Sequence, residues 1–255
     1  MTSANIRGQK AAPRGSGTSP QRSGTSPQRG NRLLAALPPA DRQRLIARCN
    51  KVDLTFGQVL YEQAERIRHV YFPLDGFISL ISTLDGTLRL EVGLVGAEGM
   101  LGASLTLGVP VAPLRAIVQG TGSALRMDAN EFIRECAHNS ALRKVLNRYL
   151  YVRIGLLAQM AACTRFHLVE ARLARWVLMT RDQANSDTFR LTQEFMALML
   201  GVRRAGITNA AGRLQKRKLI SYSRGMMTIL DGRGLEALSC ACYATTLKMY
   251  SDYMR

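Results

Sequence analysis

The segment 201–220, GVRRAGITNAAGRLQKRKLI, carries six basic residues and no acidic residue. Arginine and lysine side chains neutralise phosphates, and arginine and asparagine can also hydrogen-bond to base edges in the major groove of DNA. These residue types therefore indicate nucleic-acid recognition, with a solvated basic surface as the alternative. The basic residues are Arg203, Arg204, Arg213, Lys216, Arg217 and Lys218.

Apolar spacing gives this segment two faces on a helix at about 203–215. Its inward face would be Ile207, Ala210, Ala211 and Leu214, at i, i+3, i+4 and i+7. On the outward face, arginine suits guanine, asparagine suits adenine, and alanine or threonine can touch a thymine methyl group. The residues predicted to contact bases are Arg204, Ala205, Thr208 and Asn209.

A second set of residues around this helix is placed to hold the DNA backbone. Phosphate contacts position a protein on the duplex without specifying sequence. The residues predicted to contact phosphates are Thr192, Arg203, Arg213, Lys216, Lys218 and Arg224.

The residues before the segment predict a shorter helix. Thr192 is a good N-cap, and Glu194 in the first turn suits the helix dipole. Gly201 is favoured where a helix ends in a left-handed turn. Two short helices that meet at a glycine turn, with the small Ala197 on the first, form a helix-turn-helix pattern.

The stretch after the helix, SYSRGMMTILD, predicts two strands that turn at Arg224 and Gly225, which would form a wing beside the DNA backbone. Gly206 and Gly212 oppose a stable helix, because each costs about 1 kcal/mol relative to alanine. Their presence would fit a close approach of the helix backbone either to DNA or to the preceding helix.

The whole chain is basic, with 35 Lys and Arg against 18 Asp and Glu in 255 residues, a net charge of +17. This imbalance favours an anionic partner, which could be nucleic acid, an acidic membrane surface or an acidic protein. A membrane-surface helix needs bulky apolar residues opposite its basic face, and Ile207, Ala210 and Ala211 are too small. Without a spanning segment or a signal core, the sequence predicts a cytoplasmic protein with no membrane partner.

The sequence offers little for catalysis or metal binding. It has no GxSxG, HExxH or P-loop motif, and three histidines, His69, His138 and His167, leave few general bases. We therefore expect no enzymatic activity. The five cysteines form no CxxC pair, and Cys240 and Cys242 have no second pair or nearby histidine. We expect reduced thiols that fill the core, and no metal site.

The segments that must position the basic helix differ in composition. Residues 1–31 contain SGTSPQR twice and no acid, which predicts a disordered basic tail. Residues 32–139 begin with two short helices and continue as short β-rich runs with glycine turns, including a hairpin signal at Asp85-Gly86. These runs predict an antiparallel β-roll that could act as a sensor. Residues 164–235 would form the winged helix-turn-helix domain, and residues 236–255 a C-terminal extension.

Residues 140–163 predict a long helix with a wide apolar band. One side could pack on the roll and the other on a second chain, as in a coiled coil. The alternative is a single core helix without a partner. The residues predicted to form the dimer contact are Leu142, Leu146, Tyr149, Leu156 and Met160.

The order roll, long helix, helix-turn-helix and wing resembles the Crp/Fnr (cyclic-AMP receptor protein/Fnr) family of bacterial transcription regulators. The resemblance covers about residues 33–235 and is strongest in LTQEFMALMLGVRRAGITNAAGRLQKRKLISY, with weaker likeness in VYFPLDGFISL and VGAEGMLG. It implies an α+β fold with a cyclic-nucleotide-binding-like roll. It also implies a homodimer that binds two-fold symmetric sites on double-stranded DNA, with RNA polymerase as a further partner to consider.

The sequence also departs from the family. Members that bind cyclic AMP hold its phosphate with a Gly-Glu step and an Arg-Ser pair, whereas this chain has Gly102-Ala103 and no serine after Arg115. The tail has no cysteine for an iron–sulfur cluster, and His69 is the one histidine in the roll that could bind haem. Cyclic AMP, iron–sulfur and haem cofactors are therefore not expected, and the effector stays unknown.

Overall fold

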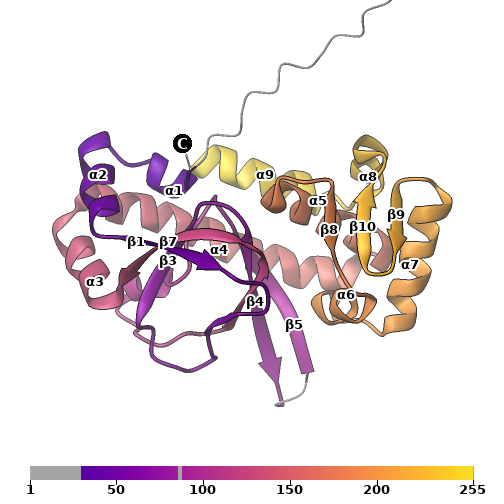
Figure 1. The fold of residues 1–255 in the computed structure, drawn as a ribbon, viewed down its shortest axis with the longest axis horizontal. Coiled ribbons are helices and arrows are strands. Elements are labelled where there is room, and N and C mark those ends of the chain that lie inside the picture. Colours follow the sequence, from indigo (N-terminus) through magenta and orange to yellow (C-terminus); the bar gives the residue numbers. More distant parts are fainter. Residues whose placement is uncertain (1–29, 86–87, 255) are drawn as a thin grey trace, which may run out of the picture.

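The computed structural model describes residues 30–85 and 88–254. The β-strands of the N-terminal half form one lobe and the C-terminal helices form a second, joined by a helix that runs behind both (Figure 1). The α+β fold class is confirmed. The predicted disorder of the tail falls on residues 1–29, outside the described part of the chain. Within that part, no helix has the length and apolar character needed to cross a membrane.

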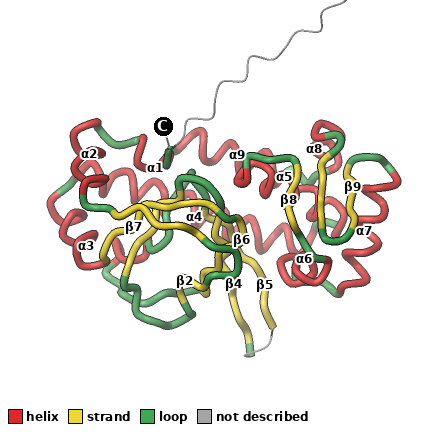
Figure 2. The backbone as a smooth tube through the Cα atoms, viewed as in Figure 1, coloured by secondary structure: helices red, strands yellow, loops and turns green. Residues whose placement is uncertain are grey.

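The first lobe is a β-roll built from two antiparallel sheets (Figure 2). The sheets have the orders β1-β7-β3 and β2-β6-β4-β5. The side chains of Phe72, Ile78 and Met127 are buried in the core of the roll. β4 and β5 pair as the hairpin predicted from Asp85-Gly86. The strands are β1 (Asn50–Leu54), β2 (Val59–Tyr61), β3 (His69–Pro73), β4 (Phe77–Leu84), β5 (Leu88–Val95), β6 (Arg115–Gly120) and β7 (Gly122–Asp128), with a 3-10 turn at Ala103–Leu107.

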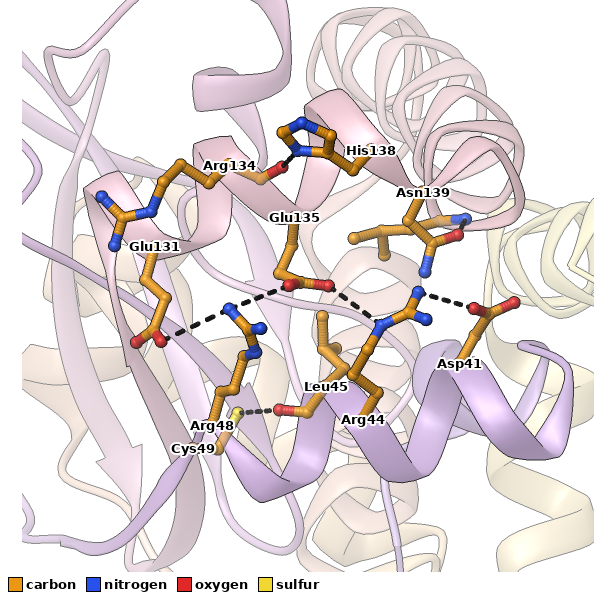
Figure 3. Close-up of polar contacts among 11 residues, drawn as sticks. Asp41, Arg44, Leu45, Arg48, Cys49, Glu131, Arg134, Glu135, His138 and Asn139 are labelled. Carbon is orange, nitrogen blue, oxygen red and sulfur yellow. Dashed lines mark hydrogen bonds and ion pairs between the residues drawn. The ribbon is translucent and has the colours of Figure 1, made fainter.

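Three short helices close one end of the roll: α1 (Arg32–Ala35), α2 (Pro39–Ala47) and α3 (Ala129–His138). Figure 3 shows how α2 is fixed to α3: the buried carboxylate of Glu135 pairs with Arg44 at 3.6 Å and with Arg48 at 3.1 Å. Arg48 also reaches Glu131 at 3.7 Å. A buried carboxylate needs partners of this kind. These ion pairs therefore fix α2 against α3.

The long helix is α4 (Ser140–Phe166), capped by Asn139 rather than by Ser140. Leu142, Leu146 and Tyr149 are at most 1% exposed and belong to the core of the roll. Their assignment to the dimer contact is therefore wrong, because a second chain cannot reach side chains that the roll already covers.

The two other residues assigned to that contact are also turned inward. Leu156 and Met160 are half-buried and line a cavity between α4, β5 and the C-terminal helices. The outward face of α4 is a different one, and its exposed apolar residues include Ile154, Leu157, Ala158 and Ala161, of which Leu157 also borders the cavity.

The second lobe begins with α5 (Val169–Ala184) and continues through a small three-stranded sheet of order β8-β10-β9. Strand β8, which the sequence did not predict, pairs with β10. Helix α9 leads back from this lobe towards the roll, so that the C-terminus lies near α1 (Figure 1). The remaining elements are β8 (Thr188–Arg190), α6 (Gln193–Leu200), α7 (Arg204–Lys216), β9 (Ile220–Ser223), β10 (Met226–Ile229), α8 (Gly232–Leu238) and α9 (Cys242–Tyr253).

A buried polar contact joins the two lobes. Glu91 on β5 accepts hydrogen bonds from Ser79 at 2.6 Å and from the indole of Trp176 on α5 at 2.8 Å. Its side chain is buried, and burial raises the pKa of Glu91 to about 7 although both hydrogen bonds and the charge of Arg175 act in the opposite direction. The contact between the lobes therefore contains a carboxyl group that titrates near neutral pH.

We predict that Glu91→Gln removes a pH dependence of stability. Because the folded-state pKa lies above that of the unfolded chain, the stabilising contribution of Glu91 is complete below about pH 4.5 and is lost as the pH rises through about 7. Glutamine can accept from Trp176 and donate to Ser79 without a charge. The variant should gain roughly 1–3 kcal/mol relative to the wild type at pH 8, and little at pH 4.5.

Urea unfolding at the two pH values measures this difference. Glu131→Gln is the matched control, because Glu131 is a partly exposed carboxylate paired with Arg48 and should give no comparable gain. An equal effect of Glu91→Gln at both pH values would contradict the prediction.

Candidate nucleic-acid interface

The corner between α6 and α7 is built from local signals. Thr192 accepts a hydrogen bond from the amide of Phe195 at 3.1 Å and caps α6, as predicted. Gly201 ends α6 with φ +61°, in the left-handed region that glycine adopts without strain. The buried guanidinium of Arg172 on α5 donates to the carbonyl of Leu200 at 2.6 Å. The C-terminal end of α6 is therefore fixed by the glycine turn and by the hydrogen bond from Arg172.

The inward face of α7 anchors the helix in the second lobe. Ile207, Ala210 and Leu214 are fully buried, and Ala211 nearly so, in one core that also contains Leu173 of α5. Full burial of a leucine or isoleucine side chain contributes about 1.5–3 kcal/mol. The predicted inward face is confirmed, and its burial fixes which side of α7 points to solvent.

The four residues predicted to contact bases, Arg204, Ala205, Thr208 and Asn209, are all exposed on the opposite face. The hydroxyl of Thr208 already bonds to the carbonyl of Arg204 at 3.1 Å and to Oε1 of Gln193 at 3.0 Å. Its methyl group and the lone pairs of its hydroxyl oxygen are the parts left for a partner. Gln193, the first residue of α6, is a polar neighbour of this face that the sequence analysis did not include.

The residues predicted to contact phosphates differ in whether an ion pair within the described chain already uses their charge. Arg213 is paired with Glu170 of α5, so part of its charge is already neutralised. Lys216 and Lys218 are exposed at the end of α7, with no ion pair within the described chain. Thr192, Arg203 and Arg224 are exposed as well. Lys216 is therefore a stronger candidate for a phosphate contact than Arg213.

The wing has the predicted geometry. β9 and β10 pair from Ile220 to Ile229, and the turn residues Arg224 and Gly225 have φ +49° and +77°. Two successive positive φ values are those of a tight two-residue hairpin turn. The hydroxyl of Tyr222 donates to the carbonyl of Leu191 at 3.0 Å and ties β9 to the segment before α6. The arginine at the tip of the wing is thereby held beside α6 and α7.

The two glycines inside α7 do not serve contacts with α6. An added Cβ at Gly212 would meet nothing within 4 Å, and one at Gly206 would meet only Val202 at 3.9 Å. At 100° per residue, Gly212 lies on the same face as Ala205 and Asn209. The predicted approach of these glycines to α6 is therefore wrong. Their close approach to an outside partner stays a prediction.

The fold gives partners to two further groups that the sequence singled out. Arg115 forms an ion pair with the half-exposed Glu62 of the roll at 3.1 Å. The expectation that Cys240 and Cys242 have no nearby histidine is wrong, because the end of α4 brings Cys163 and His167 against them.

Together, the glycine corner, the exposed basic helix and the wing define a winged helix-turn-helix domain attached to a β-roll. Residues 171–238 match the family model of the Crp-like helix-turn-helix domain. The chain has the Crp/Fnr fold, and its C-terminal part is a Crp-like helix-turn-helix domain. No curated protein matches it in sequence.

Solved structures share this fold at low sequence identity. FixK2 from Bradyrhizobium japonicum is 13% identical with a TM-score of 0.65, over 76% of this chain and 98% of that one. CLP from Xanthomonas campestris, a c-di-GMP responsive global regulator, is 14% identical with a TM-score of 0.61, over 75% and 99%. TTHB099, a CRP-family transcriptional regulator from Thermus thermophilus, is 16% identical with a TM-score of 0.61, over 74% and 96%.

We predict opposite effects of alanine at two glycines of this domain. Gly201→Ala should lower stability by about 1–2 kcal/mol, because alanine is strained at positive φ. The new Cβ would also lie 2.8 Å from the Leu90 side chain of β5. Gly212→Ala, in open space inside α7, should raise stability by up to about 1 kcal/mol.

Thermal unfolding of the two variants beside the wild type measures both shifts. Adding Leu90→Ala to Gly201→Ala should relieve the contact and leave the backbone strain. A Gly201→Ala protein as stable as the wild type would contradict the proposed role of the corner.

Proposed function

We propose that the chain is a dimeric, sequence-specific DNA-binding transcription regulator of the Crp/Fnr type that has no catalytic role and acts in the cytoplasm. The observation that carries the proposal is α7, which turns Arg204 and Asn209 outward while Ile207 and Leu214 anchor it in the core. A helix held in this way can enter the major groove with its polar face first.

The proposed dimer forms along the outward face of α4. Ile154 is 67% exposed and is followed by Leu157, Ala158 and Ala161 on or near the same face. Small residues allow two helices to approach closely, and the leucine and isoleucine supply apolar area. Two recognition helices related by a two-fold axis would then meet half-sites about 34 Å apart, or a multiple of that distance.

We propose an effector other than cyclic AMP. Its binding site would be a mostly apolar cavity of about 400 Å³ between the roll and the second lobe. It is lined by Leu94 of β5, Leu156 and Met160 of α4, Arg175 of α5 and Tyr250 of α9. Pockets of this size hold small organic ligands. A ligand here would touch both lobes, and we propose that this contact sets the placement of α7.

We predict that Arg204→Ala and Asn209→Ala reduce discrimination between the preferred site and mismatched duplexes by about 1–3 kcal/mol. Lys216→Ala should instead weaken binding to every duplex alike and reduce the slope of log affinity against log salt by about 1. Selection of bound duplexes from a random pool gives the preferred site. Titrations at several salt concentrations then give affinity and slope.

The ion-paired Arg213 supplies the control, since Arg213→Ala should change the salt slope less than Lys216→Ala. Equal affinity of the wild type for every duplex would favour the alternative, a basic module for membrane surfaces or acidic proteins. Unchanged preference in Arg204→Ala would contradict the proposed orientation of α7.

We predict that Ile154→Asp converts the dimer into monomers, because it places a charge on the proposed contact between two α4 helices. Sedimentation equilibrium measures the molecular mass. Ile133→Asp is the matched control, since Ile133 is an exposed isoleucine (43%) on α3, away from that face. This variant should stay dimeric. A wild-type protein that sediments as a monomer at all concentrations would contradict the proposed dimer.

A further inference from the structure

Four potential metal ligands from distant parts of the sequence meet where α4 ends. Cys163 lies in the last turn of α4. His167 follows it at i+4 and caps the helix, with its backbone amide donating to the carbonyl of Cys163 at 3.1 Å. Cys240 lies in the loop between α8 and α9, and Cys242 is the first residue of α9. One ligand atom from each lies within 4.8 Å of every other.

The distances between these atoms fit a tetrahedral ion. With bonds of about 2.3 Å to sulfur and about 2.1 Å to nitrogen, such a zinc site has sulfur–sulfur edges of about 3.8 Å and sulfur–nitrogen edges of about 3.6 Å. Sγ of Cys163 is 3.7 Å from Sγ of Cys240, and Sγ of Cys242 is 3.6 Å from Nδ1 of His167. Small side-chain rotations would bring the remaining pairs, which lie within 4.8 Å, to the same values.

The backbone around the cluster is fixed by its own hydrogen bonds. The carbonyl of Cys242 accepts from Gln159 of α4 at 3.3 Å and from Thr246 at 2.8 Å. The amide of Cys240 donates to the carbonyl of Ala171 on α5 at 3.4 Å. The segments that carry the ligands are therefore already joined to one another and to α5, which lowers the ordering cost of binding an ion.

Two buried arginines beside the four ligands also favour a bound metal ion. Arg172 and Arg175 are each 4% exposed and interact electrostatically with Cys163. Neither has an ion pair within the described residues, and the Nε atoms of both have no hydrogen-bond partner there. The acceptors of Arg175 are two thioether sulfurs, those of Met160 and Met179, each at 3.4 Å.

A buried positive charge without a counter-ion is costly. Glu91 interacts electrostatically with Arg175, but it forms no ion pair with it, and one carboxyl group cannot balance two guanidinium groups. Three thiolates, a neutral imidazole and Zn²⁺ sum to one negative charge. A metal–thiolate cluster would therefore supply a negative charge beside the two arginines. Three neutral thiols packed together as a small core would supply none.

We propose that Cys163, His167, Cys240 and Cys242 bind one zinc ion per chain in a tetrahedral Cys3His site. The ion joins the end of α4 to the start of α9, next to the first turns of α5. These three helices converge between the roll and the winged domain (Figure 1). Binding releases the thiol protons, as at other zinc–thiolate sites.

Such an ion fixes the link from the long helix into the winged domain. Its effect on DNA recognition rests on the proposed function, whereas its binding does not. Metal content and spectra are measured without DNA, so failure of the site and failure of the regulator are distinguishable.

The test uses the full chain purified under reducing conditions, with metal measured per chain by elemental analysis and Co²⁺ used as a spectroscopic probe. The wild type should carry one zinc. Its Co²⁺ form should show the visible bands of tetrahedral cobalt and thiolate-to-cobalt charge transfer. Cys240→Ser should bind at least about tenfold more weakly, and a chelator should lower the melting temperature of the wild type but not that of this variant.

His167→Gln serves as the second variant, because His167 is exposed and its replacement leaves the core intact. It should also weaken metal binding at least about tenfold. Cys49→Ser is the matched control, since Cys49 lies in the first lobe and its Sγ–Leu45 carbonyl bond can be kept by serine. Absence of the charge-transfer bands, or equal metal content in all four proteins, would overturn the site, as would a Cys163–Cys240 disulfide in metal-free protein.

Discussion

The surface of α4 is divided between two neighbours, the roll and α9, and solvent, and this division constrains how the two lobes are placed. Its first half is covered by the roll, where Leu142 and Tyr149 are buried. Its second half faces α9, which approaches so closely that a Cβ on Gly155 would meet Met249 at 2.3 Å. The remaining face is open to solvent. Because each neighbour needs its own apolar stripe, the band on this helix is wide, and the second lobe is placed by the point at which the helix ends.

This division explains why the sequence predicted the helix and its contact with the roll but assigned the wrong residues to the dimer contact. Apolar periodicity reports that a side chain is buried and does not report what buries it, so Leu146 fitted a second chain as well as it fitted the roll. The recognition helix was predicted more completely, because its buried partners lie close in sequence and its polar and apolar faces contrast sharply. The cap at Thr192 and the corner at Gly201 were predictable for the same reason, since local chemistry determines them.

Contacts between distant segments were beyond the sequence analysis. Glu91 and Trp176 are 85 positions apart, and Cys163 and Cys240 are 77 apart. No spacing rule connects such pairs, because their proximity depends on how α5 and α9 fold back across α4. The expectation that the cysteines are plain core thiols followed from sequence distance alone, and it missed that a histidine one turn after Cys163 would face them.

These long-range contacts lie on two sides of α5 and suggest how the lobes communicate. On one side, Trp176 bonds to Glu91 of the roll, and Leu90 of the same strand packs against Gly201. On the other, Cys163 and His167 join the end of α4 to α9. Since α5 shares its core with α6 and α7, these elements form one packed unit. A ligand in the cavity would contact residues of both lobes, and it would change their placement only by binding two placements differently.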